Sequence, residues 1–476
     1  MAEQAVAGSV AKGRSPAARA EAASTGQAGR VHPAHEARKA VLARAMRQNG
    51  VGARLQKTTT NLFRDRQEAP AKRLDVRSMN NVLAIDTERG LIDTEGMTPY
   101  DGLVDASLPH GLMPTVVPEL RSITIGGALA GIGIESSSFR YGLVHETIES
   151  FDVLLADGEV VTCRADNEHS DLFFGFPNTF GTLGYALRTI VKGHPSKRYV
   201  KIEHRPVDDA SAFGEALASA CASDTFDFVE GEVFGPGRHY LSTGRFVDEA
   251  PYVSDYTFKQ IYYRSIPNRL EDYLTARDFI WRWDTDWFWC SKATGAQNPL
   301  LRRLVFGPKR LNSRVYMRLL QLSSRYSLLE RPYRLLGYRS ESVIQDVPIP
   351  VEKLSVFLEW FHKEIGIAPV WCCPVRAYDP QHRYPLFPLE PGQLYVNVGF
   401  WDVLRRREDR PRAYYNRLIE AKVKELGGLK SLYSDAFYER AEFDRIYDRA
   451  AYDRLKARYD PNGRLKDIYD KCILGA

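Results

Sequence analysis

The pattern of apolar and polar positions predicts short strands in the first half of the chain and a mixture of helices and strands in the second. The predicted strands are rich in apolar and β-branched residues and are bounded by Gly, Pro or Asp turns, while the predicted helices follow a helical period. The predicted strands are residues 81–86, 121–125, 150–155, 185–191, 227–234 and 394–400, and the predicted helices are residues 211–222 and 351–365. This mixture indicates the α+β class.

Shifts in composition divide the 476 residues into four parts. Residues 1–50 are rich in Ala, Arg, Ser and Gly, which predicts a mobile basic tail. Residues 55–195 have the short strands and tight turns of a nucleotide-binding type of domain, and the aromatic-rich residues 196–431 are expected to form a second domain that faces the substrate. Residues 432–476 alternate charged and aromatic side chains, and we expect this segment to return to the first domain.

Charge and cysteine content exclude several classes of protein. The net charge is +5, but residues 1–57 hold ten Lys or Arg against three Asp or Glu, so the rest of the chain has a net charge of −2. A slightly acidic body disfavours nucleic-acid binding, and the basic tail is suited to transient contact with anionic lipid. The six cysteines form no C-x-x-C pair, and no apolar run reaches the length of a membrane span. We therefore expect reduced thiols, no metal site and a cytoplasmic protein, with peripheral membrane contact at most.

The most informative segment is Thr124–Ser138, which combines four glycines with three serines. Glycines let the backbone approach a ligand, and free N–H groups and hydroxyls can hold a pyrophosphate. The spacing alone fits an ordinary glycine-rich turn equally well. Gly131-x-Gly133-x-x-Ser136 lacks the third glycine of the dinucleotide-binding fingerprint, and the chain has no Walker A sequence.

The order of five segments resembles the FAD-binding domain of the vanillyl-alcohol-oxidase/PCMH flavoprotein superfamily. These segments are Pro118–Leu120, Thr124–Gly127, Ala156–Gly158, Ser170–Phe173 and Gly181–Gly184. Other segments look like the Δ24-sterol reductase branch: Gly131–Gly142, Phe228–Gly231, Trp371–Pro374 and Leu432–Ala436. Within that branch, Leu108–Pro114 and Gly131–Arg140 are similar to the actinobacterial reductases of 10-methylene fatty acyl chains in 10-methylstearate synthesis.

The resemblance implies a two-domain flavoprotein with an FAD-binding domain and a cap domain. In covalent members of the superfamily a His stands beside the Gly-Gly pair, whereas here Ala128 follows Gly127, so non-covalent FAD is expected. Thr58–Asn61 stands in the place of the first pyrophosphate loop but lacks its glycines. The residues that the resemblance assigns to the cofactor are Thr124, Gly126, Gly127, Gly131, Gly133, Glu135, Ser136, Ser137, Ser138, Gly142, Gly181, Thr182 and Gly184.

Reduction of a carbon–carbon double bond needs a hydride from the flavin and a proton from a positioned acid. The candidate donors are Glu230, Tyr433, Asp435 and Tyr438. A structural ion pair for Glu230 and simple packing for the tyrosines are the alternatives. A stripe of Trp281, Trp283, Trp287 and Trp289 is expected either to line an acyl tunnel or to belong to the core.

These observations predict an FAD-dependent reductase of an isolated double bond in a lipid, with NADPH as electron donor. The favoured substrate is a 10-methylene fatty acyl chain carried on a phospholipid. The alternatives are a Δ24-sterol reductase, an alcohol or polyol oxidase or dehydrogenase of the same fold, and a non-enzymatic lipid-binding partner of a lipid methyltransferase.

Overall fold

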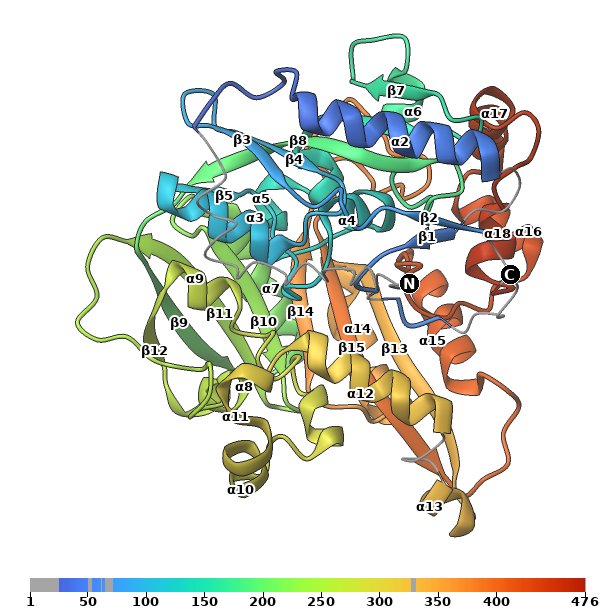
Figure 1. Cartoon of the computed structure of the whole chain (residues 1–476). Helices are drawn as coiled ribbons and strands as arrows, with labels where there is room; N and C mark the ends of the chain where they lie inside the picture. The colour runs from blue at the N-terminus through green and yellow to red at the C-terminus, as the bar shows by residue number, and fades with distance from the viewer. Residues whose placement is uncertain (1–24, 50–53, 61, 65–71, 327–330, 476) are drawn as a thin grey trace, which may run out of the picture.

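Two β-sheets, each covered by helices, organise the chain (Figure 1). The computed structural model describes residues 25–49, 54–60, 62–64, 72–326 and 331–475. In the first sheet the strand order is β3-β4-β8-β6-β7, and β5 pairs with β8. The strands of this sheet are β3 (Val82–Asp86), β4 (Leu91–Glu95), β5 (Leu112–Pro114), β6 (Ile148–Leu154), β7 (Val160–Cys163) and β8 (Tyr185–Pro195). The short strands β1 (Arg54–Gln56) and β2 (Arg73–Asp75) pair in parallel beside it.

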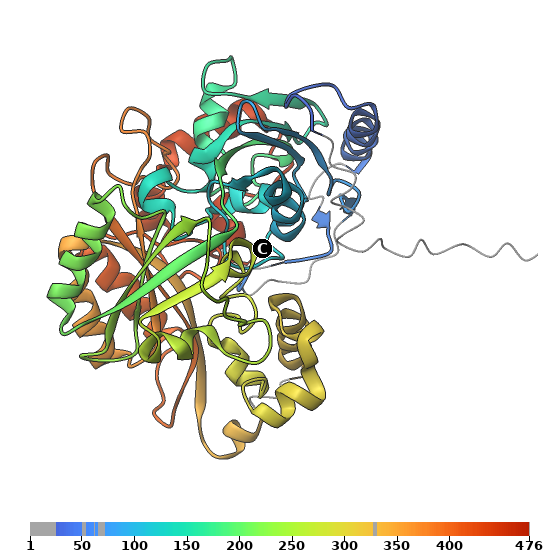
Figure 2. The same cartoon turned by 90° about the vertical axis from the view of Figure 1, so that its left-hand side faces the viewer.

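The second sheet is antiparallel throughout and has the order β12-β9-β11-β10-β14-β15-β13. Its strands are β9 (Tyr199–Val207), β10 (Phe228–Val233), β11 (His239–Val247), β12 (Glu271–Thr275), β13 (Arg339–Pro350), β14 (Val370–Val375) and β15 (Tyr395–Arg406). The central strands β10 and β14 are buried along their whole length, because helices or the first lobe cover both faces. Figure 2 shows the two sheets as separate lobes in contact.

Helices complete both lobes and the connection between them. Those of the first lobe and the C-terminal segment are α2 (Pro33–Asn49), α3 (Tyr100–Ser107), α4 (Ile125–Gly131), α5 (Ser138–Tyr141), α6 (Ser170–Gly175), α16 (Arg440–Ile446), α17 (Arg449–Tyr459) and α18 (Ile468–Cys472). Those of the second are α7 (Ala210–Ala222), α8 (Tyr262–Ser265), α9 (Ala276–Ile280), α10 (Pro299–Leu301), α11 (Gly307–Arg310), α12 (Ser313–Tyr326), α13 (Arg331–Leu335), α14 (Leu354–Glu364) and α15 (Tyr414–Glu425). Among the described residues, no helix is both long and apolar enough to cross a bilayer.

Helix α2 corrects the predicted tail, because part of residues 1–50 is folded. Leu42, Ala43 and Met46 recur at helical spacing and pack into a core cluster with residues of the first lobe. The helix is further fixed by Arg38, whose guanidinium lies 2.5 Å from the buried carboxylate of Glu95. The three apolar residues are too few to outweigh the polar composition of the segment, so the sequence pattern missed the helix. Residues 1–24 lie outside the described residues.

A second correction concerns residues 121–125, which were predicted to form a strand. The structure places residues 121–124 in a loop with a single bridge between Thr124 and Pro99, and Ile125 begins α4, where the Thr124 side chain accepts a hydrogen bond from the backbone of Gly127. The N–H of Ile125 donates to Thr98 and that of Gly126 to Gly96, so these donors serve a neighbouring turn and not a sheet. The apolar pattern therefore predicted correctly that this segment is largely buried, but the prediction that it forms a strand was wrong.

The C-terminal segment packs against the first lobe. Lys456 Nζ donates to the carbonyl oxygen of Thr182 at 2.9 Å, and Leu455 fills the space beside Gly175. This return brings Leu465, Lys466 and Lys471 to the wall of the cavity that is described next.

Candidate active site

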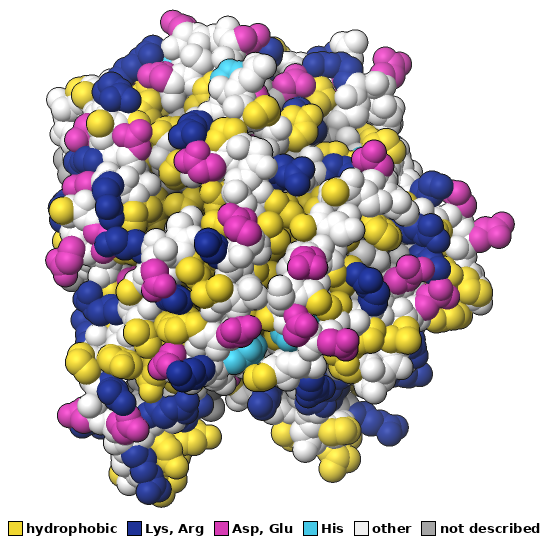
Figure 3. All heavy atoms as spheres, turned by 180° about the vertical axis from the view of Figure 1, so that it is seen from behind, with side chains coloured by type: hydrophobic (Ala, Val, Ile, Leu, Met, Phe, Trp, Pro, Cys, Tyr) yellow, Lys and Arg dark blue, Asp and Glu magenta, His cyan; other side chains and the backbone are white. Residues whose placement is uncertain are grey.

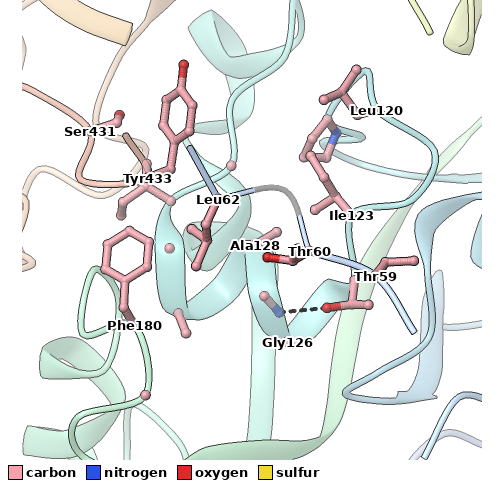
Figure 4. A pocket seen from close by; sticks show the side chains of 18 of the residues that line it. Thr59, Thr60, Leu62, Leu120, Ile123, Gly126, Ala128, Phe180, Ser431 and Tyr433 are labelled. Atoms are coloured by element: carbon pink, nitrogen blue, oxygen red, sulfur yellow. Dashed lines mark hydrogen bonds between the residues drawn. The ribbon is translucent and has the colours of Figure 1, made fainter. Parts of the chain in front are cut away.

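A cavity of about 380 Å³ lies between the two lobes. Its wall combines residues of the first lobe, of the second sheet and of the C-terminal segment. Figure 4 shows Thr60 beside Ala128, with Leu62, Phe180 and Tyr433 grouped at another part of the wall. The lining residues used below are Thr59, Thr60, Phe63, Arg64, Glu119, Leu120, Thr124, Gly126, Gly127, Gly131, Gly133, Phe180, Gly181, Gly184, Trp287, Phe288, Asp346, Trp371, Asn397, Trp401, Ser431 and Tyr433.

The glycines of α4 set how closely the backbone packs behind the cavity. A Cβ atom on Gly126 would lie 2.7 Å from the carbonyl oxygen of Gly96, a separation that real Cβ atoms do not adopt. A Cβ on Gly131 would lie 3.0 Å from the ring of Phe180 on the cavity side. The glycines therefore keep α4 against the adjoining turn and leave room in front of it.

A guanidinium at the wall lacks an ionic partner. Arg64 lies with its guanidinium carbon 4.5 Å from the centroid of the Phe180 ring. Its buried Nε and Nη1 atoms have no hydrogen-bond partner among the described residues. A buried cationic group without a partner is costly unless a ligand supplies the acceptor, so this side chain is suited to an anionic group.

Glu119 is a buried carboxyl group in the cavity wall and is only 4% exposed. Burial raises its pKa well above the ordinary value, and the neighbouring carboxyl of Glu135, with which it shares a hydrogen bond, raises it further. Two carboxyl groups can share a hydrogen bond only if one of them is protonated, so burial and the neighbouring carboxyl both favour the protonated form of Glu119 at the surface of the cavity.

Behind this pair lies one buried guanidinium that serves several carboxyl groups. Arg282 Nη2 lies 2.8 Å from Glu230 Oε1 and 3.4 Å from Glu135 Oε1. Glu230 also accepts hydrogen bonds from the indoles of Trp371, at 2.8 Å, and Trp283, at 3.2 Å. Arg282 Nε donates a further hydrogen bond to Glu230 Oε1 at 3.1 Å, so protein groups engage both oxygens of Glu230, and it is an anchoring residue of the core.

A second polar group in the wall is formed by strands β13 and β15 together with Ser431 and Tyr433. Asp346 of β13 accepts a hydrogen bond from Asn397 of β15 at 2.9 Å and another from the Tyr433 hydroxyl. Burial raises the pKa of Asp346 to about 6, although these two hydrogen bonds oppose the shift. The Tyr433 hydroxyl accepts from the indole of Trp401 at 2.8 Å. Asn397 Oδ1 and Ser431 Oγ belong to lining residues, are buried, and have no hydrogen-bond partner among the described residues, so they are suited to accept from a polar ligand.

Comparisons with known proteins agree with this geometry. The FAD binding domain family matches residues 28–164, which include α2, α4 and the glycine-rich part of the wall. Residues 28–164 form an FAD-binding domain. The chain is also 27% identical over 424 residues to the Δ24-sterol reductase of Homo sapiens, which covers 84% of this chain and 77% of that protein. It is 28% identical over 446 residues to the Δ24-sterol reductase of Pisum sativum, with 84% and 76% covered. Over 153 residues it is 31% identical to cytokinin dehydrogenase 10 of Oryza sativa subsp. japonica, covering 31% of this chain and 28% of that protein.

The cavity of the FAD-binding domain fits the cofactor chemically. The unpartnered Arg64 and the hydroxyls of Thr59 and Thr60 suit a diphosphate. The aromatic side chains of the cap suit a flat ring, and the unpartnered oxygens of Asn397 and Ser431 suit its polar edge. The match and the wall together support FAD as the cofactor, and attachment without a covalent bond stays a prediction.

The structure places seven of the thirteen predicted cofactor residues in the wall: Thr124, Gly126, Gly127, Gly131, Gly133, Gly181 and Gly184. The other six face protein groups. Ser136 Oγ donates to Glu135 at 2.5 Å, Ser137 Oγ to the carbonyl of Thr115, and Ser138 Oγ accepts from the backbone of Glu135. Thr182 Oγ1 donates to the carbonyl of Thr179, and a Cβ on Gly142 would meet Glu146. These residues shape the loop behind the cavity.

The four predicted proton donors are not brought together. Glu230 is engaged by Arg282, and of the remaining three only Tyr433 lines the cavity. Asp435 is half-buried away from the wall, and Tyr438 lies near α15 and α16. Sequence reasoning missed Glu119, although a single acid after Val116-Val117-Pro118 is a signal of a buried carboxyl. It also missed Asp346, an acid inside the apolar end of β13.

Most of the tryptophan stripe belongs to the core. Trp281, Trp283 and Trp289 are buried in the largest apolar cluster, and Trp287 alone of the four lines the cavity. The core alternative is therefore confirmed for three of the four tryptophans, and the acyl tunnel stays a prediction.

Proposed function

We propose that this chain is an FAD-dependent oxidoreductase that reduces an isolated carbon–carbon double bond in a lipid, with NADPH as electron donor. The observation that carries the proposal is the buried carboxyl of Glu119 in the cavity wall, whose protonated form is favoured by burial and by the neighbouring carboxyl of Glu135. The similarity over 84% of the chain to proteins named Δ24-sterol reductases supports the same type of reaction.

Bound FAD would supply the hydride for one carbon of the double bond. The other carbon must receive a proton, and Glu119 holds one at the cavity surface. After the transfer neither carboxyl carries the shared proton, and the buried guanidinium of Arg282, 3.4 Å from Glu135 Oε1, would offset the added negative charge. The aromatic side chains of Trp287, Phe288 and Trp371 keep water away from the reacting atoms.

An alcohol oxidase is a weaker alternative for this cavity. Oxidation of an alcohol requires a group that accepts the hydroxyl proton, whereas burial and Glu135 raise the pKa of Glu119 and favour its protonated form. Asp346, with a pKa of about 6, is ionised at neutral pH but already accepts from Asn397 and Tyr433. The groups in the wall therefore favour donation of a proton to the substrate over acceptance of a proton from it.

We propose a 10-methylene fatty acyl chain on a phospholipid as the substrate. The support comes from the Leu108–Pro114 and Gly131–Arg140 motifs, which are similar to those of 10-methylene acyl reductases. A sterol side chain is the second candidate, favoured by the names of the relatives. Both substrates present a double bond far from any polar group, so apolar contact must position either one, at about 0.8 kcal/mol for each buried CH₂.

Expression in a host that makes 10-methylene lipids tests the substrate. The expected result is a gain of about two mass units on the branched acyl chain, which corresponds to the two added hydrogens in the hydride-plus-proton reaction. A host that supplies a Δ24-unsaturated sterol serves as the comparison. Unchanged methylene lipid together with reduction of the sterol would overturn the acyl proposal. If neither lipid is reduced but an alcohol is turned over, the alcohol oxidase is favoured. If neither lipid is reduced and no flavin chemistry is seen, the lipid-binding partner of a methyltransferase is favoured.

A further inference from the structure

A projecting helical segment of the second lobe carries a concentration of positive charge. This segment, called here the basic arm, comprises residues 299–326 and 331–339 and contains α10, α11, α12 and α13. In Figure 1, α10 and α13 lie at the lower end of the molecule, and Figure 2 shows the helices from α10 to α12 as a lobe beside the sheet. In the sequence, residues 299–339 hold ten Lys or Arg and one acidic residue, Glu330, whereas the whole chain has a net charge of only +5.

Protein carboxylates use few of these charges. Arg302 pairs with Asp286, Arg314 with Asp101, and Arg339 lies 3.8 Å from Asp409. Six others are exposed and form no ion pair with any described residue: Arg303, Lys309, Arg310, Arg318, Arg331 and Arg334. Unpaired positive charge at this density is suited to an anionic surface.

Large apolar side chains are exposed among these charges. They are Leu300, Leu301, Leu304, Val305, Leu319, Tyr333, Leu335 and Leu336, and the exposed fraction reaches 77% at Leu304 and 82% at Leu335. Seen from behind, the molecule ends below in two projections in which yellow and dark-blue side chains lie together (Figure 3). Leucines at the tips with arginines around them are the pattern of a segment that inserts between lipid headgroups.

The arm is joined to the cavity by stacked aromatic rings. Phe63 and Trp287 line the cavity and stack with centroids 5.6 Å apart. Trp287 stacks in turn on Tyr316 of α12 at 6.3 Å, and Tyr316 contacts Phe306 of the arm at 6.3 Å. One apolar cluster therefore extends from the cavity wall to the arm and fixes the arm relative to the cavity.

We propose that the basic arm docks the protein on a bilayer with anionic headgroups, its exposed leucines lying between the lipids. The inference rests on the arm itself and does not depend on the reaction in the cavity. It gives the contact with anionic membrane a defined surface in the folded chain.

Co-sedimentation of the holoprotein with vesicles tests the docking surface. The vesicles are phosphatidylglycerol mixed with phosphatidylcholine, and phosphatidylcholine alone. One variant is Arg303→Ser with Leu304→Ser, and a second is Arg334→Ser with Leu335→Ser. The matched control removes one exposed basic and one exposed apolar side chain from α14, by Lys363→Ser with Val356→Ser. Far-ultraviolet circular dichroism and gel filtration verify fold and oligomeric state.

We expect tight binding of the unaltered protein to the anionic vesicles only. Each Lys or Arg near an anionic surface contributes about fivefold to the partition coefficient, so each arm variant should bind at least about tenfold more weakly when the lost leucine is included. The α14 control should bind within about twofold of the unaltered protein, because its charge is lost away from the surface. The proposal would be overturned if the unaltered protein did not bind the anionic vesicles, or if the arm variants bound them as tightly as the unaltered protein. A change of oligomeric state in the arm variants would also overturn it. Because no turnover is measured, none of these results bears on the proposed reaction.

Discussion

The substitution Glu119→Gln removes the acidic proton and nearly keeps the shape of the side chain. The amide can still donate to Glu135, so the loop should stay in place. A general acid contributes about 10²–10⁴-fold to the rate of a proton-coupled step. We therefore expect oxidation of the NADPH-reduced holoprotein by the lipid alkene to slow by that factor, whereas reduction by NADPH stays within about twofold.

The pH dependence of the alkene half-reaction distinguishes a proton donor from a residue with a purely structural role. The raised pKa of Glu119 means that the acid is present at low and neutral pH and is lost as pH rises through that value. The alkene half-reaction should therefore be constant at lower pH and fall about tenfold per pH unit above the pKa. In the Glu119→Gln variant this dependence should vanish.

Glu232→Gln is the matched control for Glu119→Gln. Glu232 is equally buried and burial also raises its pKa, but it accepts from Ser242 at 2.6 Å and does not line the cavity. Anaerobic stopped-flow spectroscopy of both half-reactions measures all three proteins. A Glu119→Gln variant that oxidises at the unaltered rate, with an unaltered pH profile, would refute the assignment of the proton donor.

Three further substitutions test other parts of the account. Arg282→Met leaves the carboxylate of Glu230 buried without its cation, so urea unfolding should show a loss of about 3–5 kcal/mol, part of which Glu230→Gln in the same chain restores. Gly126→Ala forces a Cβ against the carbonyl of Gly96, and the displaced α4 should lower the flavin content of the purified protein at least about tenfold. Burial raises the pKa of Glu146 from 4.5 to about 7, so the stability from its protonated form is complete below pH 4.5 and lost as pH rises through 7. Between pH 4.5 and 8 the free energy of unfolding should fall by about 3 kcal/mol less in Glu146→Gln than in the unaltered protein. An unchanged pH dependence of the free energy of unfolding would contradict the raised pKa of Glu146.

Much of the FAD-binding domain could be predicted because its signals are local. Glycine pairs and turn residues at Gly126 and Gly181 mark tight backbone whatever surrounds them, and the strands at 81–86 and 150–155 carry their own apolar pattern. Helix α2 could not be predicted in this way. Its stability comes from contacts of a few residues, such as Met46, with segments distant in the sequence.

The choice among buried acids also depends on contacts that the sequence does not display. Glu230 and Glu119 both stand as single acids among apolar residues, and both are buried. The difference lies in the partner, because Arg282 compensates Glu230 whereas Glu119 meets another carboxyl. Only the fold brings Arg282 beside β10, so the sequence could identify buried acids and not their protonation.

The most direct test of the central claim is an anaerobic titration of the NADPH-reduced holoprotein with a 10-methylene acyl phospholipid and, separately, with a Δ24-unsaturated sterol. The proposed reaction predicts that one of these lipids restores the spectrum of oxidised flavin, with one saturated product formed for each flavin oxidised. The account would be contradicted if the purified protein took up no FAD. It would also be contradicted if neither lipid oxidised the reduced flavin while an alcohol reduced the oxidised flavin.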